Sequence, residues 1–160
     1  MEQLNLNLLL GREENEQEII DCLNYFEENK KNVLTKRGMY IYGAPGTGKT
    51  IFVRNILLKL NYDIIKFDAG DVRNKTIVDK ITKHNMSDKN VLSLLQKKTK
   101  KIAIIMDEID GMNSGDKGGI NTLIKLIRPK KTKKQKKEET TMIPIICIGN
   151  YHIDKKIKEM

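Results

Sequence analysis

The sequence contains few of the residues that build zinc sites and disulfide frameworks. It has two cysteines and two histidines among 160 residues, with no close spacing between them. A zinc site is therefore not expected. Cys22 and Cys147 each fall within an apolar pattern, and we interpret both as reduced core residues of an intracellular protein.

Long apolar runs are also missing. No stretch of 18 consecutive apolar residues occurs, so we expect no transmembrane helix and no membrane partner. The N-terminus, with Glu2 and interspersed asparagines, lacks the basic-then-apolar order of a signal peptide. A composition of 39% hydrophobic and 32% charged residues is typical of a soluble globular protein with one domain and one sizeable core.

Positive charge, by contrast, is abundant and unevenly distributed. The net charge is +9, and one ten-residue segment supplies most of it. Three interpretations remain open: a solvated lysine run, a DNA contact, or a nuclear-localisation-like signal. No aromatic residue is interleaved for base stacking. The basic residues are Arg128 and six lysines, the candidates for nucleic-acid contact: Lys130, Lys131, Lys133, Lys134, Lys136 and Lys137.

The most informative stretch is a glycine-rich loop over residues 43–50, which fits the pattern G-x-x-x-x-G-K-S/T. An apolar run precedes it and a helical pattern follows it. Glycines allow several backbone N–H groups to point at one anion, and the helix N-terminus adds its positive dipole end. We expect Lys49 to reach the β- and γ-phosphates of a nucleotide and the Thr50 hydroxyl to ligate Mg²⁺. The predicted cofactor-binding residues are Gly43, Ala44, Pro45, Gly46, Thr47, Gly48, Lys49 and Thr50.

Strands and helices alternate along the chain. Apolar patterns predict strands over 37–42, 63–67, 102–106 and 142–148. They predict helices from residue 13, over 51–60, between 71 and 98, and over 120–127, the last ended by Pro129. This alternation indicates an α/β fold with a parallel sheet and right-handed crossovers. We divide the chain into an N-terminal arm and helix, residues 1–36, and a core over 37–160 with a basic insert at 129–139.

Polar residues follow three of the predicted strands. The glycine-rich loop follows the first, Asp107 and Glu108 the third, and Asn150 the fourth. Ligands of parallel sheets bind at the carboxyl ends of strands, so we expect these residues to meet at one edge. Asp107 suits Mg²⁺, which takes only one or two protein carboxylates, and Glu108 suits deprotonation of an attacking water. Asn150 would hold the γ-phosphate or that water, so Glu108 and Asn150 are the catalytic candidates.

The carboxylates allow a second interpretation. Asp107-Glu108-Ile109-Asp110 also spells the D-E-x-D box of helicases. A helicase of that type needs a second motor domain, for which 160 residues leave no room. We therefore favour the first interpretation.

Together the motifs resemble the AAA+ ATPases, P-loop NTPases with a three-layer sandwich, and place Asn150 at the sensor-1 position. Within that class the sequence is most similar to the large subunit of the clamp loader, replication factor C, in a version like those of large DNA viruses. Besides the glycine-rich loop, the similarity rests on Ala-Gly-Asp-Val-Arg-Asn-Lys at 69–75 and on Met-Asp-Glu-Ile-Asp-Gly-Met at 106–112. It continues with 118–120, 123–124 and Pro-Ile-Ile-Cys-Ile at 144–148 before Asn150.

The resemblance covers roughly residues 35–155, and the sequence departs from the family in two places. The lysine run lengthens the connection before the fourth strand, where some relatives carry a DNA-touching hairpin. The family's fifth strand, helical lid, sensor-2 arginine and collar have no counterpart, so we expect a domain truncated after sensor 1. In the family's strand order 5-1-4-3-2, this leaves the phosphate-loop strand at an edge. We expect such a chain to bind Mg-ATP weakly and to hydrolyse it very slowly.

The resemblance implies an ATPase subunit acting in DNA replication, with ATP and Mg²⁺ as cofactors. Its implied partners are other clamp-loader subunits in a hetero-oligomer, a sliding clamp and DNA, in the nucleus or at a viral replication site. An initiator of the origin-recognition type is an alternative, which Leu-Gly-Arg-Glu at 10–13 would suit. A nucleotide-binding fragment that does not hydrolyse ATP is another.

Overall fold

The computed structural model describes residues 11–68, 101–110, 123–137 and 140–150. The predicted helices between 71 and 98 and the motif segments 69–75 and 118–120 lie outside the described residues. Residues 123–127 are helical, and no described helix is long and apolar enough to cross a membrane. The other elements are α2 (Glu13–Asn29), β1 (Gly38–Tyr42), α3 (Lys49–Lys59), β2 (Tyr62–Asp68), β3 (Lys101–Asp107), the 3₁₀ helix η2 (Gln135–Lys137) and β4 (Ile145–Gly149).

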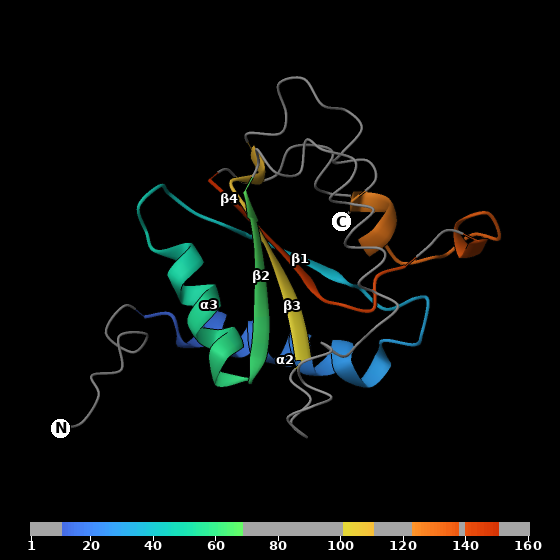
Figure 1. Cartoon of the computed structure of the whole chain (residues 1–160), viewed down its shortest axis with the longest axis horizontal. Coiled ribbons are helices and arrows are strands. Elements are labelled where there is room, and N and C mark those ends of the chain that lie inside the picture. Colours follow the sequence, from blue (N-terminus) through green and yellow to red (C-terminus); the bar gives the residue numbers. More distant parts are fainter. Residues whose placement is uncertain (1–10, 69–100, 111–122, 138–139, 151–160) are drawn as a thin grey trace.

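The four described strands form one parallel sheet in the order β1-β4-β3-β2 (Figure 1). This order confirms the parallel α/β architecture, with β1, which leads into the glycine-rich loop, as an outer strand of the described sheet. The register pairs Tyr42 with Gly149, and Asp68 with Asp107. The last residues of all four strands therefore lie along the same edge of the sheet.

Apolar residues alternate between the two faces of the central strands. On β3, Ala103 and Ile105 pack in one core cluster with α2 and α3, whereas Ile104 and Met106 pack in another with the helix at 123–127. The sheet is thus covered on both faces, with α2 and α3 on one and the 123–127 helix on the other (Figure 1). This is the three-layer arrangement that the sequence predicts.

α2 begins at Glu13 as predicted, with three acidic residues in its first turn, where they interact favourably with the helix dipole. Ile19, Leu23 and Phe26 are its buried residues. Both cysteines are predicted to be core residues, but Cys22 on α2 is only half-buried, whereas Cys147 on β4 is fully buried. α2 therefore shares the core of the sheet with α3.

β4 begins three residues later than the apolar pattern predicts. Thr141 forms a local turn instead: its hydroxyl donates to Ile143 O at 2.8 Å and accepts from Ile143 N–H at 3.0 Å. Pro144 then offers no N–H to the sheet, although its carbonyl accepts from Ile104 N–H at 3.0 Å. Side-chain capping and the proline together delay the regular strand to Ile145.

The basic segment is divided between the interior and the surface. Lys130, predicted as a nucleic-acid contact, is fully buried. Its ammonium donates to Lys125 O and its backbone N–H donates to Val33 O at 2.8 Å. Lys130 is therefore not part of an exposed basic surface, and this corrects the sequence-based assignment. The other five, Lys131, Lys133, Lys134, Lys136 and Lys137, are exposed.

Candidate functional site at the carboxyl edge of the sheet

The glycine-rich loop connects β1 directly to α3. Gly46 and Gly48 have φ angles of 76° and 77°, in the left-handed region that glycine adopts without strain. Thr47 Oγ1 donates to Ala44 O at 2.9 Å and tightens the turn between them. α3 then begins at Lys49, so the positive end of its dipole lies at the loop. This is the backbone arrangement that binds phosphate groups.

Lys49 connects the loop to the end of β4. Its ammonium group donates to Gly43 O at 2.8 Å, to Ala44 O at 2.9 Å and to Asn150 Oδ1 at 3.2 Å. These acceptors use all three donors of the ammonium group. The structure therefore brings Asn150 to the glycine-rich loop, although the two are 101 residues apart in sequence.

Asp107 lies at the end of β3, beside the start of α3. Its Oδ2 accepts from Thr50 Oγ1 at 2.9 Å and lies 3.0 Å from the ammonium group of Lys66 on β2. A hydroxyl oxygen and a carboxylate oxygen next to a phosphate-binding loop are the hard ligands that Mg²⁺ takes, so this pair fits the ion. Lys66 was not expected here, and it places a positive charge on the same carboxylate oxygen.

Glu108 is exposed and has a left-handed backbone, with φ of 52°. That conformation costs about 1–2 kcal/mol for a residue with a side chain. Its backbone N–H donates to Asp107 Oδ1 at 3.1 Å, which helps to hold the turn. Strained backbone of this kind is common at functional sites.

Asp110 follows β3, connects β1 to the residue after β4, and was not predicted as a site residue. Its Oδ1 accepts from the Tyr40 hydroxyl of β1 at 3.2 Å, and its Oδ2 accepts from the Asn150 backbone N–H after β4. Burial, together with the adjacent Asp110 carboxylate, raises the pKa of Tyr40 to about 12. The signal in the sequence was the last residue of the D-E-x-D pattern, which pointed to a helicase instead.

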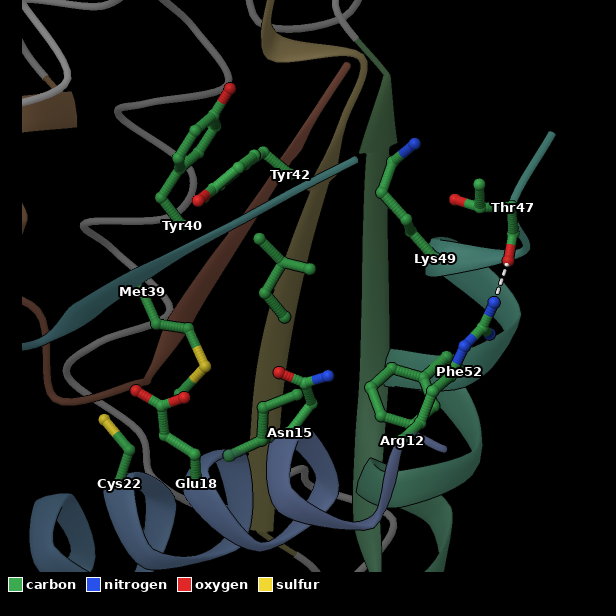
Figure 2. A pocket seen from close by; sticks show the side chains of 12 residues that line it. Arg12, Asn15, Glu18, Cys22, Met39, Tyr40, Tyr42, Thr47, Lys49 and Phe52 are labelled. Atoms are coloured by element: carbon green, nitrogen blue, oxygen red, sulfur yellow. Dashed lines mark hydrogen bonds between the residues drawn. The ribbon is translucent and has the colours of Figure 1, made fainter. Parts of the chain in front are cut away.

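A pocket of about 580 Å³ adjoins the loop and lies between β1 and α2. Figure 2 shows Lys49 and Thr47 at one end of it, Tyr40 and Tyr42 along β1, and Asn15, Glu18 and Cys22 rising from α2. Arg12 closes another side. Its guanidinium donates to Thr47 O at 2.8 Å and lies 5.7 Å from the centre of the Phe52 ring. The sequence assigns Arg12 to an N-terminal arm, and the structure shows that its side chain binds the backbone of the glycine-rich loop.

Comparison with known proteins agrees with this geometry. Replication factor C subunit 1 of Saccharomyces cerevisiae is 31% identical over 144 residues, covering 80% of this chain and 17% of that protein. The same subunit of Schizosaccharomyces pombe is 28% identical over 160 residues, covering 90% and 16%. The replication factor C large subunit of Pyrobaculum aerophilum is 26% identical over 140 residues, covering 87% and 29%. The chain thus spans less than a third of each relative.

A family model also matches most of the chain. Residues 39–159 match the model of the ATPase family associated with various cellular activities, AAA. The matched region contains the glycine-rich loop, Asp107, Glu108 and Asn150, and it takes in every strand of the described sheet apart from the first residue of β1. The chain therefore belongs to the AAA family of ATPases.

Proposed function

We propose that the chain binds Mg-ATP at the carboxyl edge of its sheet and hydrolyses it. The observation that carries the proposal is that two hydrogen-bonded pairs meet at the glycine-rich loop: Lys49 with Asn150, and Thr50 with Asp107. The loop N–H groups and the start of α3 would hold the phosphates, with Lys49 neutralising their charge. The neighbouring pocket, about 580 Å³ and lined by both polar and apolar side chains, has the size of a small-molecule site and would take the nucleoside.

Each side chain at the edge has a distinct proposed role. Thr50 and Asp107 would hold Mg²⁺, which would neutralise the charge that develops on the phosphate oxygens. Glu108 would accept a proton from the attacking water, and Asn150 would hold the γ-phosphate or orient that water. Phosphoryl transfer needs mainly positioning and charge neutralisation, and these side chains would supply both.

Binding is tested by replacing Lys49 in the full chain. Lys49→Ala should weaken Mg-ATP binding by about ten- to a hundredfold, because hydrogen bonds from a cation to phosphate are lost. Lys59→Ala is the matched control: it removes the same charge from the other end of α3, where Lys59 pairs with Glu16 at 2.6 Å. Calorimetry or a fluorescent ATP analogue measures both. Equal affinities of Lys49→Ala and the unmodified chain would contradict the proposal.

Hydrolysis is tested separately through Glu108. Glu108→Gln should retain ATP binding and lower the single-turnover rate by roughly 10²–10⁴-fold, the usual contribution of a general base. We expect a slow rate even before substitution. If Glu108→Gln hydrolyses ATP as fast as the unmodified chain, Glu108 is not the general base. If both bind ATP and neither hydrolyses it, the alternative of a nucleotide-binding fragment that does not hydrolyse ATP is favoured.

In the cell, we propose that this ATPase acts in DNA replication as part of a clamp loader. The proposal rests on the similarity to the large subunits of replication factor C. Its partners would be other loader subunits in a hetero-oligomer, a sliding clamp and DNA, inside the cell in the nucleus or at a viral replication site. Pull-down with purified loader subunits and the clamp from the source genome tests it. The proposal fails if neither binds in the presence of Mg-ATP.

The exposed lysines are proposed as a DNA contact. Lys131 and Thr132 donate their backbone N–H groups to Gln135 Oε1, each at 3.1 Å, so a folded turn presents the charges. Replacing all five exposed lysines by glutamine should weaken duplex DNA binding and reduce its salt slope by about 0.9 per lost phosphate contact. Arg54→Gln combined with Lys59→Gln, on α3, is the control. An unchanged salt slope in the lysine variant would leave a solvated run or a localisation signal.

A further inference from the structure

We propose that Asp110 is a positioning residue, which fixes the sensor side chain of Asn150 against Lys49 by binding the Asn150 backbone and anchoring it to Tyr40. The inference rests on the proposed function, since it assigns a task to a residue of that same site. It concerns a carboxylate that does not touch the glycine-rich loop itself.

The placement of Asp110 is set by its neighbour in the chain. Ile109 is only 2% exposed and packs in the core cluster beneath the 123–127 helix. This anchors the turn after β3, so the next side chain has little freedom to move away from the sheet edge. Asp110 therefore reaches its partners from a fixed backbone.

One oxygen of Asp110 binds β1, and the other binds the residue that follows β4. Oδ1 accepts from the Tyr40 hydroxyl at 3.2 Å and Oδ2 accepts from the Asn150 backbone N–H. Hydrogen bonds to an ionised carboxylate are stronger than those between neutral groups. The space around them is filled: a Cβ on Gly149 would lie 2.6 Å from Asp110 Oδ1 and closer still to the Tyr40 hydroxyl. The clamp is thus packed as well as hydrogen-bonded.

Asn150 carries the effect to the glycine-rich loop. Its side-chain Oδ1 accepts from Lys49 Nζ at 3.2 Å, while its backbone N–H is held by Asp110. A series of contacts runs from Tyr40 to Asp110, from Asp110 to Asn150, and from Asn150 to Lys49. The glycine-rich loop connects Lys49 to β1, the strand on which Tyr40 lies. Because the backbone of Asn150 is fixed from one side, its amide is directed to the other, where the γ-phosphate would lie.

The first measurement needs no nucleotide. In the nuclear magnetic resonance spectrum of the full chain, the proton of the Asn150 backbone N–H should resonate downfield, as expected for a group that donates to a carboxylate. Asp110→Asn should move it upfield, because the substitution removes the negative charge and replaces one of the two accepting oxygens by an NH₂ group, which cannot accept. Asp21→Asn is the control, a carboxylate on α2 that accepts only from Gln17 Nε2 at 2.8 Å among the hydrogen bonds described. An Asn150 resonance unmoved by Asp110→Asn overturns the proposal.

The second measurement asks whether Asp110 acts through Asn150. The preference for ATP over ADP reports on the γ-phosphate, and Asn150→Ala and Asp110→Asn should each reduce it by roughly three- to tenfold. The double variant should lose no more than Asn150→Ala alone, since both changes remove the same interaction. Additive losses, or an equal loss of ATP and ADP affinity, overturn the proposal.

The experiments also distinguish failure of this proposal from two other outcomes: a chain that binds no nucleotide, and a variant that does not fold. If the unmodified chain binds neither nucleotide, the proposed function fails, while the Asn150 resonance still decides whether Asp110 holds that backbone. If Asp110→Asn does not fold, Tyr40→Phe replaces it in both measurements. That variant removes one of the two bonds to Asp110 and should reduce the ATP preference by a smaller factor. An ATP preference identical to that of the unmodified chain would then overturn the proposal.

Discussion

The contact between β4 and its neighbours makes Gly149 the most demanding position at the sheet edge. A Cβ added there would lie 2.6 Å from Asp110 Oδ1 and 2.9 Å from Tyr40 Cζ, and closer still to the Tyr40 hydroxyl. Real Cβ atoms do not approach other atoms so closely, so both side chains must move. The backbone of Gly149 is not left-handed, and the effect of Gly149→Ala is therefore steric alone.

The expected loss of stability follows from overpacking. Forcing an extra methyl group into a filled site costs about 1–3 kcal/mol. In a protein of this size each kcal/mol lowers the melting temperature by roughly 2–4 °C, so Gly149→Ala should melt about 2–12 °C lower. The displaced groups are Tyr40 and Asp110, and the ATP preference should fall with stability if Asp110 positions Asn150.

Gly43, the residue that follows the neighbouring strand β1, offers a matched control. A Cβ there would lie 3.6 Å from Lys49 Cδ and 3.7 Å from Thr47 Oγ1, which are ordinary van der Waals distances. Gly43→Ala should therefore change the free energy of unfolding by less than about 1 kcal/mol. Thermal unfolding followed by circular dichroism measures both variants. The reasoning is refuted if Gly149→Ala melts with the unmodified chain or if Gly43→Ala loses as much stability.

Three other measurements test the site. Lys66→Met should lower the Mg²⁺ concentration needed for ATP binding by roughly two- to fivefold, because Lys66 competes for Asp107, while Lys66→Arg should not. A thiol reagent should label Cys22 and spare Cys147 until the chain unfolds, since burial raises the pKa of Cys147 to about 12; mass spectrometry decides. Because the pKa of Tyr40 is raised, the hydrogen bond from its hydroxyl to Asp110 should contribute fully to stability below pH 10, and this contribution should be lost as the pH rises through about 12. Alkaline unfolding of Tyr40→Phe should not show that loss.

The glycine-rich loop and the meeting of the strand ends at one edge of the sheet were predictable from the sequence. The loop is a local pattern, and its conformation depends on glycines that are next to one another in the chain. Topology then does the rest: in a parallel sheet with short connections, residues that follow strands share one edge. Thus Thr50 and Asp107 were expected to meet although 57 positions separate them in the sequence, and Thr50 Oγ1 lies 2.9 Å from Asp107 Oδ2.

Contacts that depend on strand register were not predictable. Lys66 pairs with Ile105 across β2 and β3, and only this register brings its ammonium to Asp107, two residues further along. Asp110 is similar, because its partners come from β1 and from the end of β4. Periodicity assigns a residue to a face of the sheet but does not say which neighbours its side chain reaches.

The burial of Lys130 shows a different limit. Within a run of lysines its charge suggested solvent, whereas its ammonium binds Lys125 O near the end of the preceding helix. A lysine just beyond a helix C-terminus commonly satisfies such carbonyls, so its distance from the helix end was the available signal. Charge patterning alone does not separate a capping lysine from its solvated neighbours.

The contacts within the site also bear on which ligand it prefers. Lys49 uses its three donors on Gly43 O, Ala44 O and Asn150 Oδ1, and Asp107 Oδ2 already contacts Thr50 and Lys66. A phosphate group that binds Lys49 must replace at least one of these acceptors, so the energy gained is a difference between two sets of hydrogen bonds. A single phosphate ion makes that exchange at one point. A triphosphate with its metal ion would make it along the loop, at Lys49 and at Asp107 together, and this multiplicity would favour Mg-ATP over inorganic phosphate.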